Sequence, residues 1–199
     1  EKITRSFCMI NFSNQITQIF EQSIDTLNKS ISLTSDINNA INLITDSIKN
    51  GNKLIIFGNG GSAADAQHIA AELIGRFKLE RKSLPAIALT TDTSILTSLG
   101  NDYSYDTIFS RQCESLVLKN DVVIGISTSG NSKNVELGMK TALKKGAKTI
   151  GLLGNNGGII KSVSDISIIV NSVDTANIQE SHRVIYHIIC NLVEKQLSE

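Results

Sequence analysis

The fold is decided by residues 53–62, which read Lys-Leu-Ile-Ile-Phe-Gly-Asn-Gly-Gly-Ser. The apolar run from Leu54 to Phe57 is short and unbroken, as expected of a parallel strand that is buried on both faces. A glycine-rich loop follows at 58–62, and a helix is expected over about 63–76. A buried strand, a glycine loop and a helix in this order predict one unit of an α/β fold.

The same order of strand, loop and helix recurs along the rest of the chain. Further strands are expected at 86–89, 122–126, 148–153 and 166–170, and further helices after Asp92, over about 133–145 and over about 175–197. Alternating strands and helices with buried strands predict a five-stranded parallel sheet between helices, a three-layer α/β sandwich. In such sheets ligands bind beyond the carboxyl ends of the strands, where the Gly- and Ser-rich loops fall.

Apolar residues at helical spacing precede the first strand. They predict one long helix or two in sequence over 12–49, closed by Asn50 and Gly51. We therefore expect residues 1–199 to form a single domain whose helical extension, 12–50, is used in oligomerisation.

Composition excludes several classes of function. Lys+Arg and Asp+Glu both number 19, which argues against a nucleic-acid surface or a polybasic membrane patch. No run of about 18 apolar residues occurs, so no membrane span is expected. Cys8, Cys113 and Cys190 are scattered, without CxxC spacing, and no credible signal peptide is present. Such cysteines indicate reduced thiols and a cytoplasmic location.

The stretch 127–132, Ser-Thr-Ser-Gly-Asn-Ser, is the most informative loop. It places four hydroxyls and a glycine between a buried strand and the start of a helix. Free amides and the positive end of the helix dipole favour a phosphate at such a point. The competing reading is a simple helix N-cap, but a cap needs one such residue rather than four.

The first loop, 58–63, fits the dinucleotide pattern G-x-G-x-x-[GA]. The acidic residue expected about 20 positions later would be Glu80, which lies in a charged loop rather than at a strand end. No Gly-Lys-[Ser/Thr] sequence occurs, so the loop is not a P-loop. The alternative is that it shapes a sugar site through its amides and Asn59.

Candidate acid–base groups lie on two helices. His68 and Glu72 are four residues apart and share one helical face, so they can bind a divalent metal, supply a general base or form a surface pair. The last helix carries His182, His187 and Gln179. His182 is either structural or functional.

Gln179 and His187 lie about 12 Å apart along one helix axis. Residues from different subunits would therefore share one ion more easily than residues of one chain. This spacing predicts an oligomer with sites at subunit interfaces.

Three stretches together resemble the sugar isomerase (SIS) superfamily and, within it, the phosphoheptose isomerases. They are Gly-Asn-Gly-Gly-Ser at 58–62, Ile-Ser-Thr-Ser-Gly-Asn-Ser at 126–132 and Ile-Gln-Glu-Ser-His at 178–182. Gly-Asn-Asp at 100–102 and Ile-Phe-Ser-Arg-Gln at 108–112 also fit. The likeness covers nearly the whole chain, and the combined set of motifs is specific whereas each piece is not.

The resemblance implies the SIS fold and a homotetramer that converts sedoheptulose 7-phosphate to D-glycero-D-manno-heptose 7-phosphate. This reaction is the first step of bacterial heptose synthesis for lipopolysaccharide or capsule. The resemblance implies one zinc ion per subunit, with ligands at His68, Glu72, Gln179 and His187, and an acid–base pair at Glu72 and His187. The implied substrate contacts are Asn59, Gly60, Gly61, Ser62, Glu72, Asn101, Asp102, Ser127, Thr128, Ser129, Ser132 and Gln179.

Two positions depart from the family pattern. Ala71 stands where some relatives carry a second glutamate, and Asn177 stands where arginine is common. The second departure bears on how the far end of the substrate is held. Rival hypotheses are a non-catalytic SIS protein that binds a replication initiator, a sugar-phosphate sensor and a nucleotide-dependent oxidoreductase. Glu72 and His187 favour the isomerase over the first rival.

Overall fold

The computed structural model describes residues 11–198, so Cys8 lies outside the described residues. Its centre is a sheet of five parallel strands in the order β2-β1-β3-β4-β5. The strands are β1 (Leu54–Gly58), β2 (Ala86–Ala88), β3 (Val122–Ser127), β4 (Lys148–Gly154) and β5 (Ile166–Val170). The predicted five-stranded parallel sheet is confirmed.

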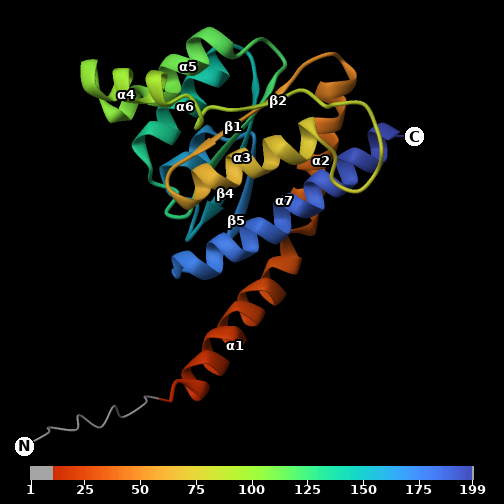
Figure 1. The fold of residues 1–199 in the computed structure, drawn as a ribbon, viewed down its shortest axis with the longest axis vertical. Helices are drawn as coiled ribbons and strands as arrows, with labels where there is room; N and C mark the ends of the chain where they lie inside the picture. The colour runs from red at the N-terminus through yellow and green to blue at the C-terminus, as the bar shows by residue number, and fades with distance from the viewer. Residues whose placement is uncertain (1–10, 199) are drawn as a thin grey trace, which may run out of the picture.

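Helices cover both faces of the sheet (Figure 1). The α-helices are α1 (Ser13–Ser30), α2 (Thr34–Lys49), α3 (Gly61–Ile74), α4 (Thr93–Asp102), α5 (Ile108–Leu116), α6 (Lys133–Lys144) and α7 (Thr175–Ser198). Short 3-10 turns lie at Ile31–Leu33, Tyr105–Thr107 and Ile159–Val163. The predicted extension is two helices in sequence rather than one. The region after Asp92 also holds two helices, because Ser104 caps a new turn through its side chain.

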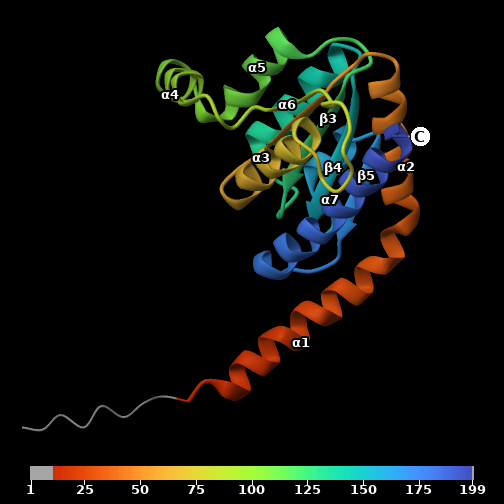
Figure 2. The ribbon, with the colours of Figure 1, turned by 45° about the vertical axis from the view of Figure 1, so that its right-hand side comes forward.

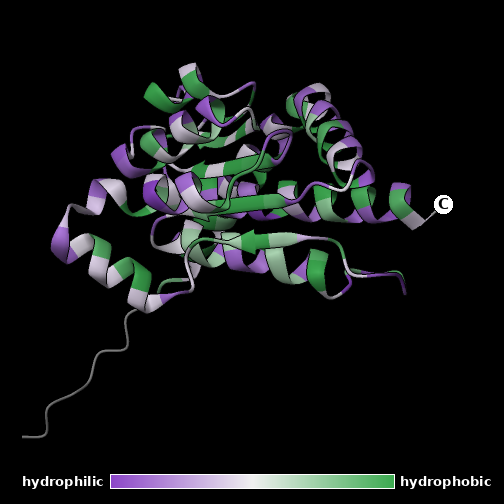
Figure 3. Cartoon of the chain, turned by 90° about the horizontal axis from the view of Figure 1, so that it is seen from above, coloured by the Kyte–Doolittle hydropathy of each residue, from purple (hydrophilic) through white to green (hydrophobic). Residues whose placement is uncertain are grey.

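Alternation along the strands builds two cores. In β1, Leu54 and Ile56 face the layer of α2, α3 and α7, whereas Ile55 and Phe57 face the layer of α5 and α6. The central strands are correspondingly apolar, while the helices alternate apolar and polar faces (Figure 3). Burial on both faces explains why the strands lack polar alternation.

The strand order reverses between β1 and β3, which are neighbours in the sheet. The loops that leave these two strands therefore lie side by side at the carboxyl edge, the usual ligand position in such sheets. These loops are the glycine loop, residues 58–62, and the serine loop, residues 127–132.

Helix α1 projects away from the sheet and its covering helices (Figure 2). Thr26 is its only buried residue. Most of its large apolar side chains are exposed, namely Ile16, Ile19, Phe20 and Ile24. Within residues 11–198, no helix combines the length and the apolar character that a membrane span requires.

Candidate active site

Helices α3 and α7 pack in parallel and bring the predicted residues together in register. At the start of α3, a Cβ added to Gly61 would lie 2.5 Å from Gln179 Nε2. Two turns later, His68 contacts Tyr186 and His187. The two helices advance together along the sheet, so Gln179 lies level with Gly61 and His187 lies level with His68.

His68, Glu72 and His187 form one cluster, which we call the histidine cluster. One ligand atom from each residue lies within 4.8 Å of the others. His68 Nε2 is 2.9 Å from Glu72 Oε1, and the rings of His68 and His187 are 5.1 Å apart in an edge-on arrangement. All three side chains are half-buried, so the cluster opens to solvent on one side.

Gln179 does not join this cluster within one chain. It lies at the glycine loop, and seven residues of helix separate Gly61 from His68, which is about 10 Å along the axis. The four implied zinc ligands therefore divide into three that converge and one that lies beside the glycine loop.

Tyr186 supports the cluster from the protein interior. Its hydroxyl lies 3.0 Å from His68 Nδ1 and 3.3 Å from Asp65 Oδ1, and it accepts a hydrogen bond from Arg183 Nε at 3.2 Å. Burial, together with the carboxylate of Asp65, raises the pKa of Tyr186 to about 12. The hydroxyl is therefore neutral at pH 7.

His187 lies between aromatic rings. Its ring centroid is 4.7 Å from that of Tyr186 and 5.5 Å from that of Phe77. Burial and then the neighbouring His68 lower the pKa of His187 below its ordinary value. These neighbours favour the neutral imidazole, which can accept a proton or bind a metal.

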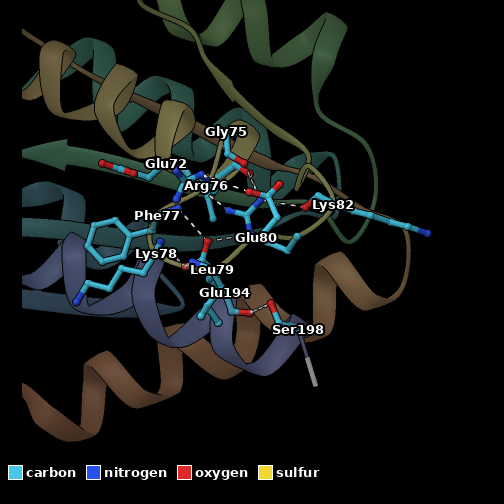
Figure 4. Close-up of polar contacts among 12 residues, drawn as sticks. Glu72, Gly75, Arg76, Phe77, Lys78, Leu79, Glu80, Lys82, Glu194 and Ser198 are labelled. Carbon is cyan, nitrogen blue, oxygen red and sulfur yellow. Dashed lines mark hydrogen bonds and ion pairs between the residues drawn. The ribbon is translucent and has the colours of Figure 1, made fainter.

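The loop after α3 is fastened to α7 by a buried carboxylate (Figure 4). Glu194 accepts hydrogen bonds from the amides of Phe77, Lys78 and Leu79 at 2.7–3.0 Å and pairs with Arg81 at 3.1 Å. Burial raises the pKa of Glu194, but these amides and Arg81 more than offset it and the net pKa is lowered.

Arg81 also closes the end of α3. It donates to the carbonyl oxygens of Glu72, Leu73 and Gly75 at 2.8–3.1 Å. Carbonyls in the last turn of a helix have no partner within the helix, so this guanidinium satisfies them. The turn that carries Glu72 and the loop that carries Phe77 are thereby held against α7.

The serine loop gathers its hydroxyls at the start of α6. Ser127 Oγ lies 3.0 Å from Ser132 Oγ and 3.4 Å from Ser129 Oγ. Gly130 has a φ of +68°, and its backbone packs directly on that of Gly157. Hydroxyls converging on a helix N-terminus form an arrangement that suits a phosphate.

The glycine loop differs from expectation at Asn59. Its side chain exchanges two hydrogen bonds with Asn134, at 2.8 and 2.9 Å, and accepts a third from Tyr105 at 3.2 Å. Asn59 therefore ties the glycine loop to the first turn of α6 through its amide. Its backbone remains the part of the residue that can meet a ligand.

Other residues that the sequence analysis singled out have polar partners of their own. Asn101 and Asp102 are exposed at the end of α4, where Asn101 Nδ2 donates to Asp102 Oδ1 at 2.8 Å. Asn177 accepts a hydrogen bond from Ser23 of α1 at 3.1 Å, so it joins α1 to α7. His182 is fully buried, and its Nε2 donates to Leu153 O at 3.0 Å. This contact favours a structural role for His182.

Sequence reasoning missed Asp65, Tyr186, Asn134 and Tyr105. Asp65 precedes His68 by three residues and Tyr186 precedes His187 by one. The spacing of Asp65 on one helical face could have identified it. Nothing local identified Tyr186, because its contact with His68 joins residues 118 positions apart.

The donor set of the histidine cluster fits a divalent metal. Two imidazoles and one carboxylate within reach of one point are ligands that zinc takes in catalytic sites. The same groups can also act as acid and base, since a carboxylate and an imidazole lie side by side in a half-buried position. The arrangement supports metal-assisted proton transfer on a phosphorylated ligand.

Comparison with known proteins gives a consistent result. Residues 11–154 match the family model for the SIS domain. The chain is 61% identical to the phosphoheptose isomerase of Citrifermentans bemidjiense over 83% of this chain and 86% of that protein. It is 52% identical to the phosphoheptose isomerase of Aquifex aeolicus over 93% and 97%. The solved phosphoheptose isomerase of Francisella tularensis superposes with a TM-score of 0.90 at 34% identity, over 94% of this chain and 100% of that chain.

Proposed function

The chain belongs to the SIS domain family and, within it, to the phosphoheptose isomerases, so it is an isomerase, and we propose that it acts through the histidine cluster. The substrate we assign is sedoheptulose 7-phosphate, and the product is D-glycero-D-manno-heptose 7-phosphate. The observation that carries the assignment of the site is the convergence of His68, Glu72 and His187 within 4.8 Å.

The reaction moves one proton between neighbouring carbons. Glu72 removes a proton from carbon 1 of the ketose, which gives an enediol, and the proton returns to carbon 2 to give the aldose. His187 carries the second proton from the hydroxyl oxygen on carbon 1 to the carbonyl oxygen on carbon 2. Oε1 of Glu72 faces His68, so Oε2 is the oxygen we assign to the carbon-bound proton.

His68, Glu72 and His187 would hold a zinc ion, one in each subunit. When bound, zinc supplies a Lewis acid that stabilises negative charge on the enediolate oxygens. Gln179 of the same chain lies at the glycine loop, so we assign it a substrate contact there. A role for Gln179 as a zinc ligand requires a copy from a neighbouring subunit.

The serine loop is the proposed phosphate site. The hydroxyls of Ser127, Ser129 and Ser132 lie together at the start of α6, where the helix dipole favours an anion. We also assign substrate contacts to Thr128, to the backbone of residues 59–62 and to Asn101 and Asp102. Fixing the phosphate would orient the two reacting carbons.

We propose that the protein assembles as a homotetramer through its helical extension. Ile19 and Phe20 are 60% and 66% exposed on α1, and burying each would contribute about 1.5–3 kcal/mol. A hollow lined mostly by apolar residues lies between the α1–α2 junction and α7. A second copy of the same chain, with the same apolar stripe, is the occupant that fits both.

The assembly proposal is tested with Phe20→Glu. The variant should elute as a smaller species in size-exclusion chromatography with light scattering, because it places a charge in the proposed interface. Gln18→Glu, on the opposite face of α1, is the matched control and should leave the assembly unchanged. A tetramer in both variants, or a monomer in the unmodified protein, would remove α1 from the proposal.

We place the enzyme in the cytoplasm, at the first step of heptose synthesis for surface glycans. Cys113 and Cys190 are free thiols, as suits a reducing compartment. The rival hypotheses of a partner-binding protein or a sensor receive no comparable support, because neither role requires a carboxylate and two imidazoles in one cluster.

The activity is tested by incubation with sedoheptulose 7-phosphate and detection of an isomeric aldoheptose phosphate. Parallel samples contain a chelator, or a chelator followed by added Zn²⁺. Product in the untreated sample, loss with chelator and recovery with Zn²⁺ would support the whole proposal. Product formation that persists with chelator would refute the role of zinc but not the isomerase assignment. Absence of product under every condition would overturn the substrate assignment.

A further inference from the structure

The hydroxyl of Tyr186 meets three polar groups inside the protein. Arg183 Nε is 3.2 Å away, Asp65 Oδ1 is 3.3 Å away and His68 Nδ1 is 3.0 Å away. Tyr186 is 1% exposed and Asp65 is 2% exposed. Water therefore has little access to this contact, and the hydrogens must be shared among these groups.

Counting donors and acceptors fixes the direction of each bond. The guanidinium of Arg183 can only donate and the carboxylate of Asp65 can only accept. The single hydrogen of Tyr186 therefore goes to Asp65, while Arg183 donates to the tyrosine oxygen. The remaining contact has no hydrogen left on the tyrosine side, so Nδ1–H of His68 must donate to Tyr186.

The reverse arrangement is unfavourable. If Tyr186 donated to His68 Nδ1, two oxygens, that of Tyr186 and Oδ1 of Asp65, would face each other at 3.3 Å without a hydrogen between them. Asp65 Oδ1 would then keep the long hydrogen bond that Arg183 Nη2 donates at 3.4 Å but would lose the one from Tyr186, and such a loss is unfavourable for a buried charged acceptor. The polar contacts therefore select one tautomer of His68.

We propose that Tyr186, held by Asp65 and Arg183, is a positioning residue that keeps the hydrogen of His68 on Nδ1 and so presents the Nε2 lone pair to a divalent metal. This inference rests on the proposed function, because it assumes that the histidine cluster binds such an ion. His68 Nε2 points to Glu72 Oε1 at 2.9 Å, and a carboxylate and a lone pair at that distance require a cation or a proton between them.

Packing against Tyr186 also fixes the orientation of the His68 imidazole ring. Tyr186 packs edge-on against His68 and His187, with centroids 5.4 Å and 4.7 Å away. One side chain thereby sets the tautomer of one histidine and borders the other. Groups of this kind that orient metal ligands usually affect metal affinity by about 10- to 100-fold.

The test measures zinc affinity by competition with a chromophoric chelator in the full-length protein. Tyr186→Phe removes the hydroxyl and should weaken zinc binding by about 10- to 100-fold. Tyr103→Phe, which removes an exposed hydroxyl elsewhere, is the matched control and should leave the affinity unchanged.

Asp65→Asn provides a second variant of nearly equal volume. The new amide can donate to the tyrosine oxygen, which frees the tyrosine hydrogen to point at His68 Nδ1 and favours the opposite tautomer. Zinc affinity should fall although the hydroxyl remains. Nitrogen-15 NMR of the histidines in the zinc-loaded, unmodified protein should show metal on Nε2 of His68. This readout reports which nitrogen binds the metal, and a merely structural role for Tyr186 would not alter it.

The outcomes distinguish a failure of the proposed metal site from a failure of the role of Tyr186. Absence of zinc binding by the unmodified protein would refute the metal site of the proposed function. Zinc binding by the unmodified protein, with equal affinity in folded Tyr186→Phe and Asp65→Asn, would overturn the role of Tyr186 alone. Metal on Nδ1 of His68 would overturn it as well.

Discussion

The serine loop and the histidine cluster are built in different ways. The loop is short and local, and its hydroxyls contact one another within six residues of sequence. The cluster joins helices that are more than 100 residues apart, and it depends on contacts from Tyr186 and from the loop fastened by Glu194. The proposed phosphate site therefore needs one short loop, whereas the proposed chemistry needs the packing of α3 on α7.

The largest expected effect tests the histidine cluster. His187→Ala should lower kcat by about 100- to 10,000-fold, because it removes one partner of the proposed acid–base pair. The measurement is steady-state turnover of sedoheptulose 7-phosphate, with circular dichroism to confirm the fold. Lys195→Ala, exposed on the same helix, is the control and should keep normal turnover. Normal turnover in His187→Ala would assign the chemistry to another residue.

A second prediction concerns His182, the buried histidine of α7. Burial lowers the pKa of His182 to about 4, whereas an unfolded histidine has a pKa near 6.5. The unfolded chain then binds the additional proton as pH falls from 6.5 towards 4, and stability is lost over that window. At about 1.4 kcal/mol per pH unit, the loss approaches about 3 kcal/mol.

His182→Gln checks this prediction, since glutamine can still donate to Leu153 O but cannot take up a proton. Urea unfolding at pH 7 and pH 4.5 should show a smaller loss of stability in the variant than in the unmodified protein. An equal loss in the two proteins would show that other groups cause the acid sensitivity.

The third prediction addresses the serine loop. Replacing either Ser127 or Ser129 with alanine should raise KM by about 10- to 100-fold, because a hydrogen bond to a charged group contributes about 1.5–3 kcal/mol. The effect on kcat should be smaller than that of His187→Ala. Ser162→Ala, an exposed serine outside the loop, is the control. An unchanged KM would place the phosphate elsewhere.

Much of the fold could be predicted from sequence because its signals are local. Unbroken apolar runs mark the buried strands, and Gly- and Ser-rich loops mark their carboxyl ends. The pair of His68 and Glu72 follows from helical spacing alone. The break after Asp102 was missed because the capping side chain of Ser104 acts within an otherwise helical region.

What sequence could not predict depends on tertiary contacts. Asn59 is a typical ligand-facing residue in a glycine loop, yet its side-chain amide is hydrogen-bonded to Asn134. Asn134 lies on α6, which follows the neighbouring strand β3. Tyr186 carries no local pattern that separates it from other core residues. Helical spacing already separates Gln179 from His187, but the contact of Gln179 with Gly61 depends on the parallel packing of α7 on α3.

The most direct test of the account is product formation from sedoheptulose 7-phosphate by Glu72→Gln. The substitution keeps the shape of the side chain but removes the carboxylate that we propose as the base. We predict that turnover falls by about 100- to 10,000-fold while the fold and the binding of substrate by calorimetry are retained. Glu114→Gln, an exposed glutamate on α5, should turn over normally. Turnover close to normal in Glu72→Gln would contradict the claim that the histidine cluster moves the proton.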